Sequence, residues 1–283
     1  MPPRLRSVVE AIESLYPPST AMSWDRVGLV TGDLDQPVRL VHFAVDPTIA
    51  VIEEAVDAGA DLLLTHHPLL LRGVHSVATT SAKGYAVTRA VVGDLAVYCA
   101  HTNADVADPG VCDALAEVCG LGPTAPLTLD EGRAVGRVGQ LPEPISLRGF
   151  AERLAQGLPG TAGGIRVSGD LDTPVRTVAV LGGAGDDLFA AVRAAGADVY
   201  VTADLRHHPA SEAREESRGG PPYLVDAGHW ASEWPWLRNA RDRLLAQLDT
   251  AGHDAGSVDT WISTLRTDPW DLVVGANAPG GAP

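Results

Sequence analysis

Short apolar segments alternate with longer amphipathic segments along the chain, and this alternation predicts an α/β fold. The short segments, which resemble buried strands, are residues 39–45, 61–65, 95–100, 134–141, 164–168, 176–181, 223–226 and 259–265. The longer segments, which resemble helices by spacing or by their capping residues, are 3–16, 47–57, 81–92, 109–118, 146–156, 184–194 and 230–248. Residues 23–33 and 121–132 are rich in turn formers and are expected to be loops.

The strand–helix–strand pattern occurs twice. Residues 59–61 and 196–198 both read Gly-Ala-Asp, and Thr65 matches Thr202 at the same offset. The strands expected at 95–100 and 223–226 are each followed by a histidine. We therefore expect two related α/β lobes with mixed sheets flanked by helices, whose strand ends face one another across a cleft.

The repeat and the turn-rich connections suggest the domain organisation. We expect the first lobe at 1–125 and the second at 126–273, with the final helix free to pack back on the first lobe. Residues 274–283 are rich in Gly, Ala and Pro and are expected to be disordered.

Composition narrows the class of partners. A formal net charge of −15 and a pI near 4.9 argue against a constitutive nucleic-acid or anionic-membrane surface. The three cysteines form no C-x-x-C pair and are typical of reduced, buried thiols. The N-terminal segment lacks the apolar core of a signal peptide, and no apolar run approaches the roughly 18 residues of a membrane helix. We expect a cytoplasmic protein without a membrane partner.

The segment 61–73, DLLLTHHPLLLRG, is the first candidate site. His66 and His67 follow a buried strand that Pro68 should end, and the carboxyl ends of such strands are where open α/β sheets build sites. Neighbouring residues of a regular strand point to opposite faces, so two imidazoles in one site imply a turn, with one ring for each of two metal ions. The alternative is a solvated loop.

Two further segments place a histidine four residues before a carboxylate. If a helix starts at Gly228, His229 and Glu233 lie one turn apart and form a ligand pair suited to zinc, manganese or iron; the alternative is an exposed salt bridge. His101 and Asp105 share the spacing, and we expect Asp105 in a loop, as a ligand or as a turn cap. His101 is a ligand, a core histidine or, as we favour, a hydrogen-bond partner of a ligand.

Together, five residues could hold two divalent ions bridged by a carboxylate and a water: His66, His67, Asp105, His229 and Glu233. Two-metal sites of this kind activate the bridging water as a nucleophile. Histidine and carboxylate ligands without thiolate suit zinc, iron, manganese or nickel. His101 and His208 are candidates for catalytic proton transfer; His207 and His208 occupy the repeat position of the first histidine pair, and an exposed helix start is their alternative.

Other site types match poorly. The segment 181–187, LGGAGDD, follows a strand and opens a predicted helix, where it could receive an anion. It lacks the lysine of a phosphate loop and the full dinucleotide fingerprint, so we favour a tight turn. The sequence contains neither a G-x-S-x-G elbow nor an H-E-x-x-H run.

Six runs of residues resemble the Nif-three-like dinuclear metal-centre family, whose members are described as GTP cyclohydrolase 1 type 2 homologues. The runs, which follow the expected order over nearly the whole chain, are SWDRVGL (23–29), LLTHHPLL (63–70), AHTNAD (100–105), VTADLRHH (201–208), AGHWASE (227–233) and TDPW (267–270). The resemblance implies two similar α/β lobes, a two-metal site at the five residues named above and a toroidal homohexamer. Arg26 stands where members often carry asparagine, which leaves the role of the 23–29 loop open.

Two hypotheses of function follow. The first is a metal-dependent hydrolase acting on a nucleotide-like or phosphorylated small molecule. GTP cyclohydrolase activity, which opens the guanine imidazole ring and releases formate, is a weak form of this hypothesis because no segment resembles a guanine pocket. An acidic protein would also need metal or local arginines, such as Arg72 or Arg206, to accept a triphosphate. The second is a non-enzymatic metal-binding hexameric scaffold, adaptor or metal chaperone. Nucleic acid within the ring is opposed by the net charge.

Overall fold

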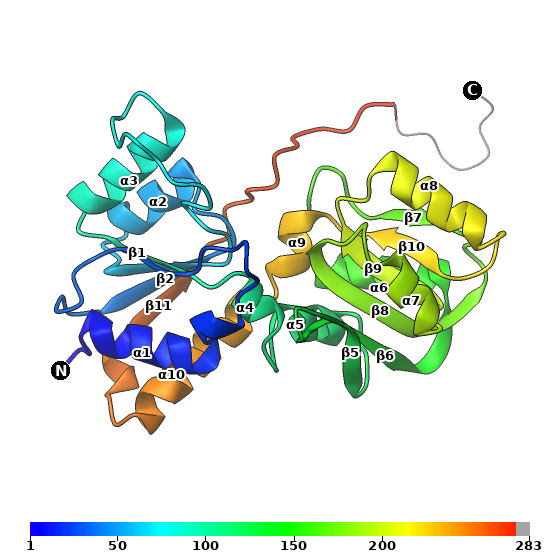
Figure 1. Cartoon of the computed structure of the whole chain (residues 1–283), viewed down its shortest axis with the longest axis horizontal. Coiled ribbons are helices and arrows are strands. Elements are labelled where there is room, and N and C mark those ends of the chain that lie inside the picture. The colour runs from blue at the N-terminus through cyan, green and yellow to red at the C-terminus, as the bar shows by residue number, and fades with distance from the viewer. Residues whose placement is uncertain (276–283) are drawn as a thin grey trace.

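Two separate β-sheets organise the chain, one in each of two lobes that lie side by side (Figure 1). In this computed structural model the described residues are 1–275, so most of the expected disordered tail at 274–283 lies outside them. The first sheet has five strands in the order β1-β4-β3-β2-β11, and the second has six in the order β5-β6-β8-β9-β10-β7. Both sheets mix parallel and antiparallel pairs, so the predicted fold class is confirmed.

The first lobe is a sheet covered on both faces. Its strands are β1 (Gly28–Thr31), β2 (Leu40–Ala44), β3 (Leu62–Thr65), β4 (Ala96–Cys99) and β11 (Asp259–Ile262). The covering helices are α1 (Leu5–Leu15) and α10 (Trp236–Thr250) on one face and α2 (Ile49–Asp57) and α3 (Ala82–Val92) on the other (Figure 1). Leu62 and Leu64 pack toward α1 and α10, and Leu63 packs toward α2 and α3, because successive strand residues point to opposite faces.

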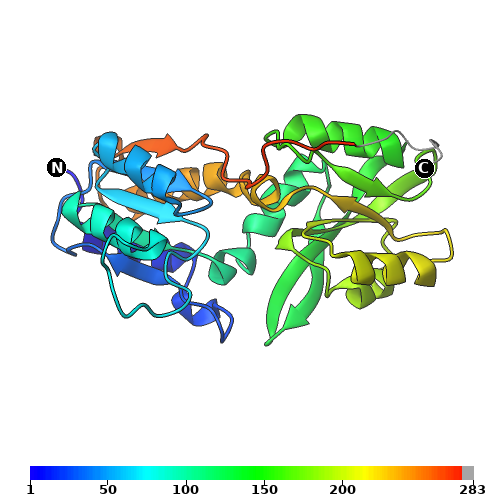
Figure 2. The same ribbon diagram turned by 90° about the horizontal axis from the view of Figure 1, so that it is seen from above.

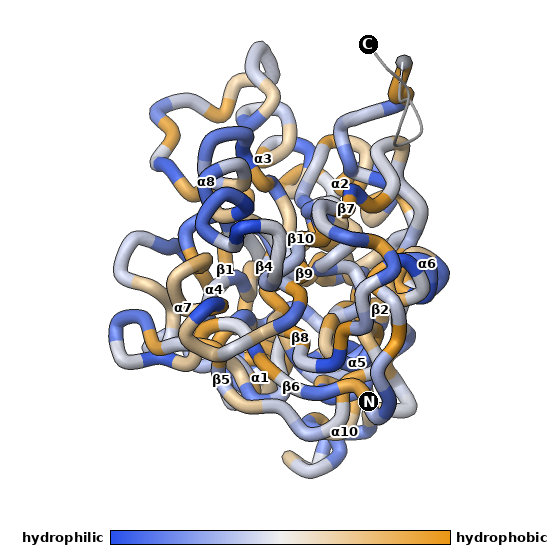
Figure 3. Tube along the Cα trace, turned by 90° about the vertical axis from the view of Figure 1, so that its right-hand side faces the viewer, coloured by the Kyte–Doolittle hydropathy of each residue, from blue (hydrophilic) through white to orange (hydrophobic). Residues whose placement is uncertain are grey.

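The second lobe repeats this layering. Its strands are β5 (Thr124–Asp130), β6 (Arg133–Ser146), β7 (Arg166–Ser168), β8 (Pro174–Ala184), β9 (Val199–Ala203) and β10 (Tyr223–Asp226). Its helices are α5 (Val111–Val118) and α6 (Leu147–Gly157) on one face and α7 (Phe189–Ala194) and α8 (His207–Glu216) on the other (Figure 2). Polar segments lie on α6 and α8, whereas apolar segments lie on the enclosed strands (Figure 3).

The sequence repeat has a structural cause. Val41 pairs with Leu62 in the first sheet, and Val178 pairs with Val199 at the equivalent position in the second. The Asp61 carboxylate accepts the backbone N–H groups of residues 39 and 40 at 2.6 and 3.1 Å. Asp198 accepts those of residues 176 and 177, both at 2.8 Å. The repeated aspartate therefore caps the start of the neighbouring strand in each lobe.

The chain returns to the first lobe after it has built the second. Two short helices, α4 (Thr102–Asp105) and α9 (His229–Glu233), lie where the lobes meet, and short 3₁₀ helices lie at Pro18–Thr20 and Ala255–Ser257. α10 packs on α1, with the rings of Tyr16 and Trp236 5.6 Å apart, and β11 pairs in parallel with β2. The first sheet thus contains a strand from 259–262, and β5 spans the boundary expected between residues 125 and 126.

Three predictions of secondary structure are wrong: two strands were missed, and one expected helix is divided in two. Residues 23–33 and 121–132 were expected to be loops, yet they contain β1 and β5, because pairing with β4 and β6 outweighs local turn propensity. β5 is an edge strand, where Pro126 is tolerated. The single helix expected at 230–248 divides into α9 and α10 at Pro235.

The start of α5 also differs from the prediction. Asp108 and Pro109 were expected as the capping pair, whereas the N-cap is Gly110. The Gly110 N–H donates to the Asp113 carboxylate at 2.8 Å, which closes the first turn. Among residues 1–275, no helix has the length and apolar character needed to cross a membrane.

Candidate metal centre

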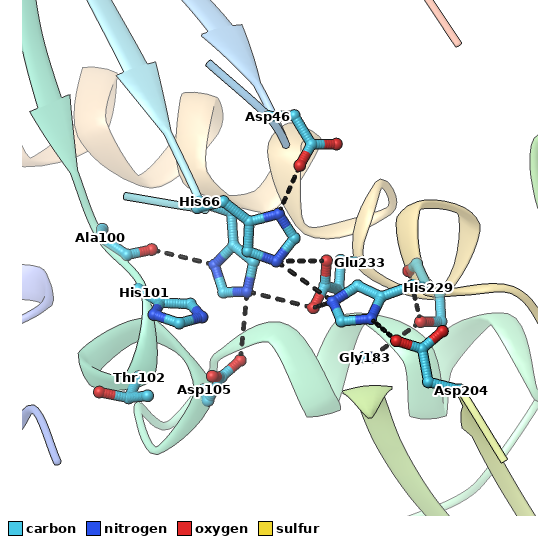
Figure 4. A network of polar contacts seen from close by, with 12 residues as sticks. Asp46, His66, Ala100, His101, Thr102, Asp105, Gly183, Asp204, His229 and Glu233 are labelled. Carbon is cyan, nitrogen blue, oxygen red and sulfur yellow. Dashed lines mark hydrogen bonds and ion pairs between the residues drawn. The ribbon is translucent and has the colours of Figure 1, made fainter. Parts of the chain in front are cut away.

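Four histidine rings from three separate segments meet where the lobes join (Figure 4). Neighbouring ring centroids lie between 5.0 and 5.4 Å apart. His66 and His67 follow β3, His101 follows β4, and His229 starts α9. The carboxyl ends of neighbouring parallel strands share one edge of a sheet, so the first three rings gather there. The return of the chain through α9 adds the fourth.

Two carboxylates complete the cluster. Glu233 Oε1 lies 3.2 Å from His229 Nε2 and 3.5 Å from His66 Nε2, and Glu233 Oε2 lies 3.2 Å from His67 Nε2. Asp105 Oδ1 lies 3.5 Å from His66 Nε2. Asp105 ends the short helix α4 and is not in the loop expected for it, so both histidine–carboxylate pairs use the spacing of one helical turn. The structure therefore brings together all five residues proposed as ligands, with His101 beside them.

The four rings are oriented by hydrogen bonds from their Nδ1 atoms. Each partner is an acceptor: the Ala100 carbonyl at 3.0 Å for His66, Asp46 at 2.7 Å for His67, Asp25 at 2.9 Å for His101 and Asp204 at 2.8 Å for His229. Because carbonyl and carboxylate oxygens cannot donate, Nδ1 carries the hydrogen in each ring. The neutral ring then has a lone pair on Nε2, as a metal ligand requires.

The nitrogen and oxygen atoms of the cluster are arranged to bind a metal ion and not to form hydrogen bonds with one another. His67 Nε2 and His229 Nε2 are 3.3 Å apart, and the buried His66 Nε2 and Glu233 Oε2 lack hydrogen-bond partners among the described residues. Lone pairs that converge in this way repel unless a positive charge lies between them. Two groups of residues could each hold an ion, His66–His67–His101 and His67–His229–Glu233, since the ligand atoms within each lie within 4.8 Å of one another. Nitrogen and oxygen donors without sulfur suit zinc, iron, manganese or nickel.

Protons are the competing source of positive charge. Burial lowers the pKa of His229, but attraction to Glu233 and the hydrogen bond to Asp204 outweigh it and raise that pKa to about 10. The pKa of His67 is likewise raised well above its usual value, against burial, by Glu233 and Asp46. Burial raises the pKa of Glu233, but the three neighbouring histidines hold it well below its usual range. A metal must therefore displace protons from the same atoms.

The carboxylates around the cluster are themselves held in place. Asp46 also accepts a hydrogen bond from the Thr267 hydroxyl. Asp25 is buried, which raises its pKa, but hydrogen bonds from His101 and Thr102 outweigh burial and hold the pKa well below the usual value. None of these roles was predicted. A signal existed for Asp46 and Asp204, which follow strands β2 and β9, and for Asp25 and Thr267, which lie in family-like runs.

The glycine-rich segment at 181–187 forms a wall of the site. We expected a tight turn there, but β8 continues through Ala184. Gly183 has a φ of +69°, and a Cβ at this position would lie 2.4 Å from Glu233 Oε1 and 3.1 Å from His229 Nε2. The Gly183 N–H donates to Ser232 Oγ at 2.9 Å, which ties the strand to α9. The absence of a side chain at Gly183 leaves room for the Glu233 carboxylate.

Two cavities adjoin the cluster. The first cavity, of about 880 Å³, is lined by His67, His101, Asp105, His229 and Glu233 together with residues of both lobes. The second cavity, of about 920 Å³, is lined by His67 and His229, their partners Asp46 and Asp204, and the segment 267–273. The first cavity is therefore lined mainly by ligand residues of the cluster, whereas the second is lined by two of its histidines and by the aspartates that orient them.

Four candidate residues lie outside the cluster. His207 and His208 are exposed at the start of α8 with their rings 5.2 Å apart, and His207 lines a third cavity of about 400 Å³. Arg206 pairs with Asp186. Among the described residues, neither His208, Arg206 nor Arg72 lines the first or second cavity. A catalytic role for His208 stays a prediction, whereas His101 joins the cluster.

Comparison with known proteins decides the family. The model of the Duf34/NIF3 (NGG1p interacting factor 3) family matches residues 3–269. The chain belongs to the Duf34/NIF3 family. A Streptomyces coelicolor member named GTP cyclohydrolase 1 type 2 homolog is 50% identical over 282 residues, covering 98% of this chain and 96% of the relative. A Mycobacterium tuberculosis member of the same name is 35% identical over an alignment of 378 residues, which covers 95% of this chain and 97% of the relative.

Solved structures of Duf34/NIF3 proteins share the two-lobed fold. A Bacillus cereus protein related to NIF3 superposes with a TM-score of 0.85 at 27% identity, covering 96% of this chain and 100% of that chain. A hypothetical protein from Staphylococcus aureus also has a TM-score of 0.85, at 26% identity and the same coverage. The family resemblance predicted from sequence is thus confirmed.

Proposed function

We propose that this Duf34/NIF3 protein is a metal-dependent hydrolase whose cluster holds two divalent ions and acts on a nucleotide-like or phosphorylated small molecule. The observation that carries the proposal is the convergence of histidine Nε2 atoms and two carboxylates on one cavity, with each ring fixed from behind. Bound divalent ions would supply Lewis-acid activation of a substrate oxygen and of water near neutral pH.

The residues that would hold the ions are the five predicted from sequence: His66, His67, Asp105, His229 and Glu233. Glu233 is placed to serve both groups of ligands, because Oε1 faces His66 and His229 while Oε2 faces His67. Glu233 is only 3% exposed, and the low dielectric of a buried site strengthens the attraction between its carboxylate and a bound cation.

His101 is the candidate for proton transfer. Its Nδ1–H donates to Asp25 at 2.9 Å, and its ring lines the first cavity beside Asp105. A carboxylate behind an imidazole fixes the ring and its tautomer, so that Nε2 has a lone pair to accept a proton, as a general base requires. His101 also belongs to a group of residues that could hold an ion, but only its Nε2 is free, and this proposal assigns that atom to proton transfer.

The proposal is tested by metal analysis and turnover together. Protein purified without added metal is analysed for bound ions, the main ion is restored, and nucleotides and phosphoesters are screened for hydrolysis. We expect two ions per chain and turnover of one substrate class, and Glu233→Gln should abolish turnover. Glu152→Gln, at an exposed position of α6, is the matched control. Two ions without turnover of any class would contradict the proposal.

GTP ring opening, the activity named for the relatives, has less support than other hydrolysis. Beyond bound metal ions, a triphosphate needs lysine or arginine side chains to balance its charge, yet neither lines the first cavity among the described residues. Formate release from GTP, measured beside the phosphoester screen, separates this activity from the others.

A hexameric scaffold is the second candidate. Large apolar side chains of the C-terminal segment are exposed, Trp270 to 67% and Leu272 to 75%, which suits contact between subunits of a ring. Light scattering measures the oligomeric state of the wild type and of Glu233→Gln. A scaffold would keep its hexamer and its partners in the variant, whereas an enzyme would keep the hexamer and lose turnover.

A further inference from the structure

Trp24 lines the first cavity and is 55% exposed, so it stands at the opening of that cavity. Its ring centroid lies 5.8 Å from that of His101 at an interplanar angle of 80°, so the two rings form a T-shaped contact and not a stack, and His101 covers at most one face of Trp24. Exposed tryptophan is unusual, because burial of its large apolar surface is favourable.

The loop that carries Trp24 is anchored on both sides of it. Ser23 donates its N–H and its hydroxyl to Glu131 at 3.0 and 2.6 Å. Asp25 accepts the Thr102 N–H at 3.0 Å and the His101 Nδ1–H at 2.9 Å. The exposure of Trp24 is therefore not the result of a loose loop: the structure holds a flat aromatic surface in place beside the cluster.

Other apolar side chains share this opening. Leu129, on β5 of the second lobe, is 68% exposed, and Leu71, after the histidine pair, is also exposed; both line the first cavity. With Trp24 they come from three segments and both lobes. An apolar rim around a polar centre is typical of small-ligand sites.

Apart from the histidines of the cluster, the charged side chains that line the first cavity among residues 1–275 are all acidic. Asp130 and Asp187 line it together with Asp105 and Glu233 of the cluster, and no lysine or arginine among residues 1–275 does. Carboxylates repel a polyphosphate and accept hydrogen bonds from ring N–H and amino groups. The lining therefore favours a molecule that carries donors and little negative charge away from the metal.

We propose that the first cavity binds its substrate by stacking a flat heteroaromatic ring on Trp24, and that the substrate is a nucleobase or nucleoside-like molecule without a polyphosphate. Trp24 is then a specificity-determining residue. This inference rests on the proposed function in taking the cluster as the reacting centre, and it narrows the substrate class.

Calorimetric titration of the metal-loaded, full-length protein tests the inference. The probes are the four common ribonucleosides, GTP, and ribose 5-phosphate as a ring-free control, with metal content measured before and after each titration. We expect at least one nucleoside to bind as tightly as GTP or tighter, and ribose 5-phosphate to bind at least about ten-fold more weakly. Failure of all four nucleosides to bind, or GTP binding ten-fold more tightly than each of them, would overturn the inference.

Variants identify Trp24 as the platform. Trp24→Ala should weaken nucleoside binding about ten-fold or more, and Trp24→Phe should retain it within about three-fold, because the ring and not the indole N–H is needed. Trp24→Leu, which keeps apolar bulk without a ring, replaces the alanine variant if the latter does not fold. Trp261→Ala is the matched control, since this tryptophan is also about half exposed, at 51%, and lines none of the three cavities described above. Equal binding by Trp24→Leu and wild type would overturn the role of stacking.

The outcomes separate this inference from the proposed function. Two bound ions with phosphoester turnover that Trp24→Ala leaves unchanged would refute the ring-binding cavity and leave the hydrolase intact. Trp24-dependent nucleoside binding without turnover of any substrate would support the ring-binding cavity and refute the hydrolase. Light scattering of each variant checks that a change in subunit assembly does not account for the loss.

Discussion

His67 Nε2 lies 3.3 Å from His229 Nε2, although 162 residues separate the two histidines in the chain. The first follows β3 of one lobe, and the second begins α9 after the strands of the other. Glu233, one helical turn after His229, contacts His66 as well. The cluster therefore exists only when the lobes are docked, and its metal content should report on that docking.

Asp46→Asn should weaken metal binding about 10- to 100-fold while the fold persists, because the charged partner of His67 Nδ1 is lost. Asparagine retains an oxygen that can accept the hydrogen bond, so the ring should keep its place. Dissociation constants measured by competition with a chelator check this, with the exposed Asp35→Asn as the control. Unchanged affinity would show that Asp46 does not tune His67.

Gly183→Ala should displace the Glu233 carboxylate, because the added Cβ would lie 2.4 Å from Oε1. Gly196→Ala is the matched control: its φ of +64° is close to the +69° of Gly183, but nothing lies within 4 Å of its Cβ. Both variants should lose about 1–2 kcal/mol of stability from the left-handed backbone. Thermal unfolding measures that shared cost, and metal analysis should show a loss in Gly183→Ala alone.

Metal affinity should rise with pH well beyond neutrality. The pKa of His229 in the metal-free protein is raised to about 10, so protons compete with the metal up to that pH. Chelator competition between pH 6 and 10 checks this, and an affinity that levels off near pH 6.5 would contradict it.

The stability of the metal-free protein should depend on pH in the opposite direction. A raised folded-state pKa stabilises fully below 6.5, and this contribution is lost as the pH rises through about 10.

The three cysteine thiols should be unreactive in the native protein. All are buried and free, and burial raises the pKa of Cys112 to about 12 and those of Cys99 and Cys119 further. Thiolate is the reactive form, so a disulfide reagent should label none of them before unfolding and three per chain afterwards. Rapid labelling of one thiol at neutral pH would show that its surroundings open to solvent.

The local sequence correctly predicted those elements that their own pattern of apolar and polar residues stabilises. The buried strand before His66 and the one-turn spacing of His229 and Glu233 predicted what the structure contains, and the repeated Gly-Ala-Asp predicted a second sheet built like the first. The strands β1 and β5 were missed because each is stabilised by its partner strand. Helix boundaries shifted for a similar reason, since caps such as Gly110 act through neighbouring side chains.

By itself, the sequence determined which side chains could bind a metal, because that depends on the chemistry of imidazole and carboxylate and on spacing along one strand or one helical turn. The tertiary structure decided which of them meet and what surrounds them: Asp25, Asp46 and Asp204 behind the rings, the bare Cα of Gly183 beside Glu233, and Trp24 at the opening. These contacts join residues from separate strands and from both lobes. No local pattern encodes them, since they arise only when two sheets and the returning helix pack together.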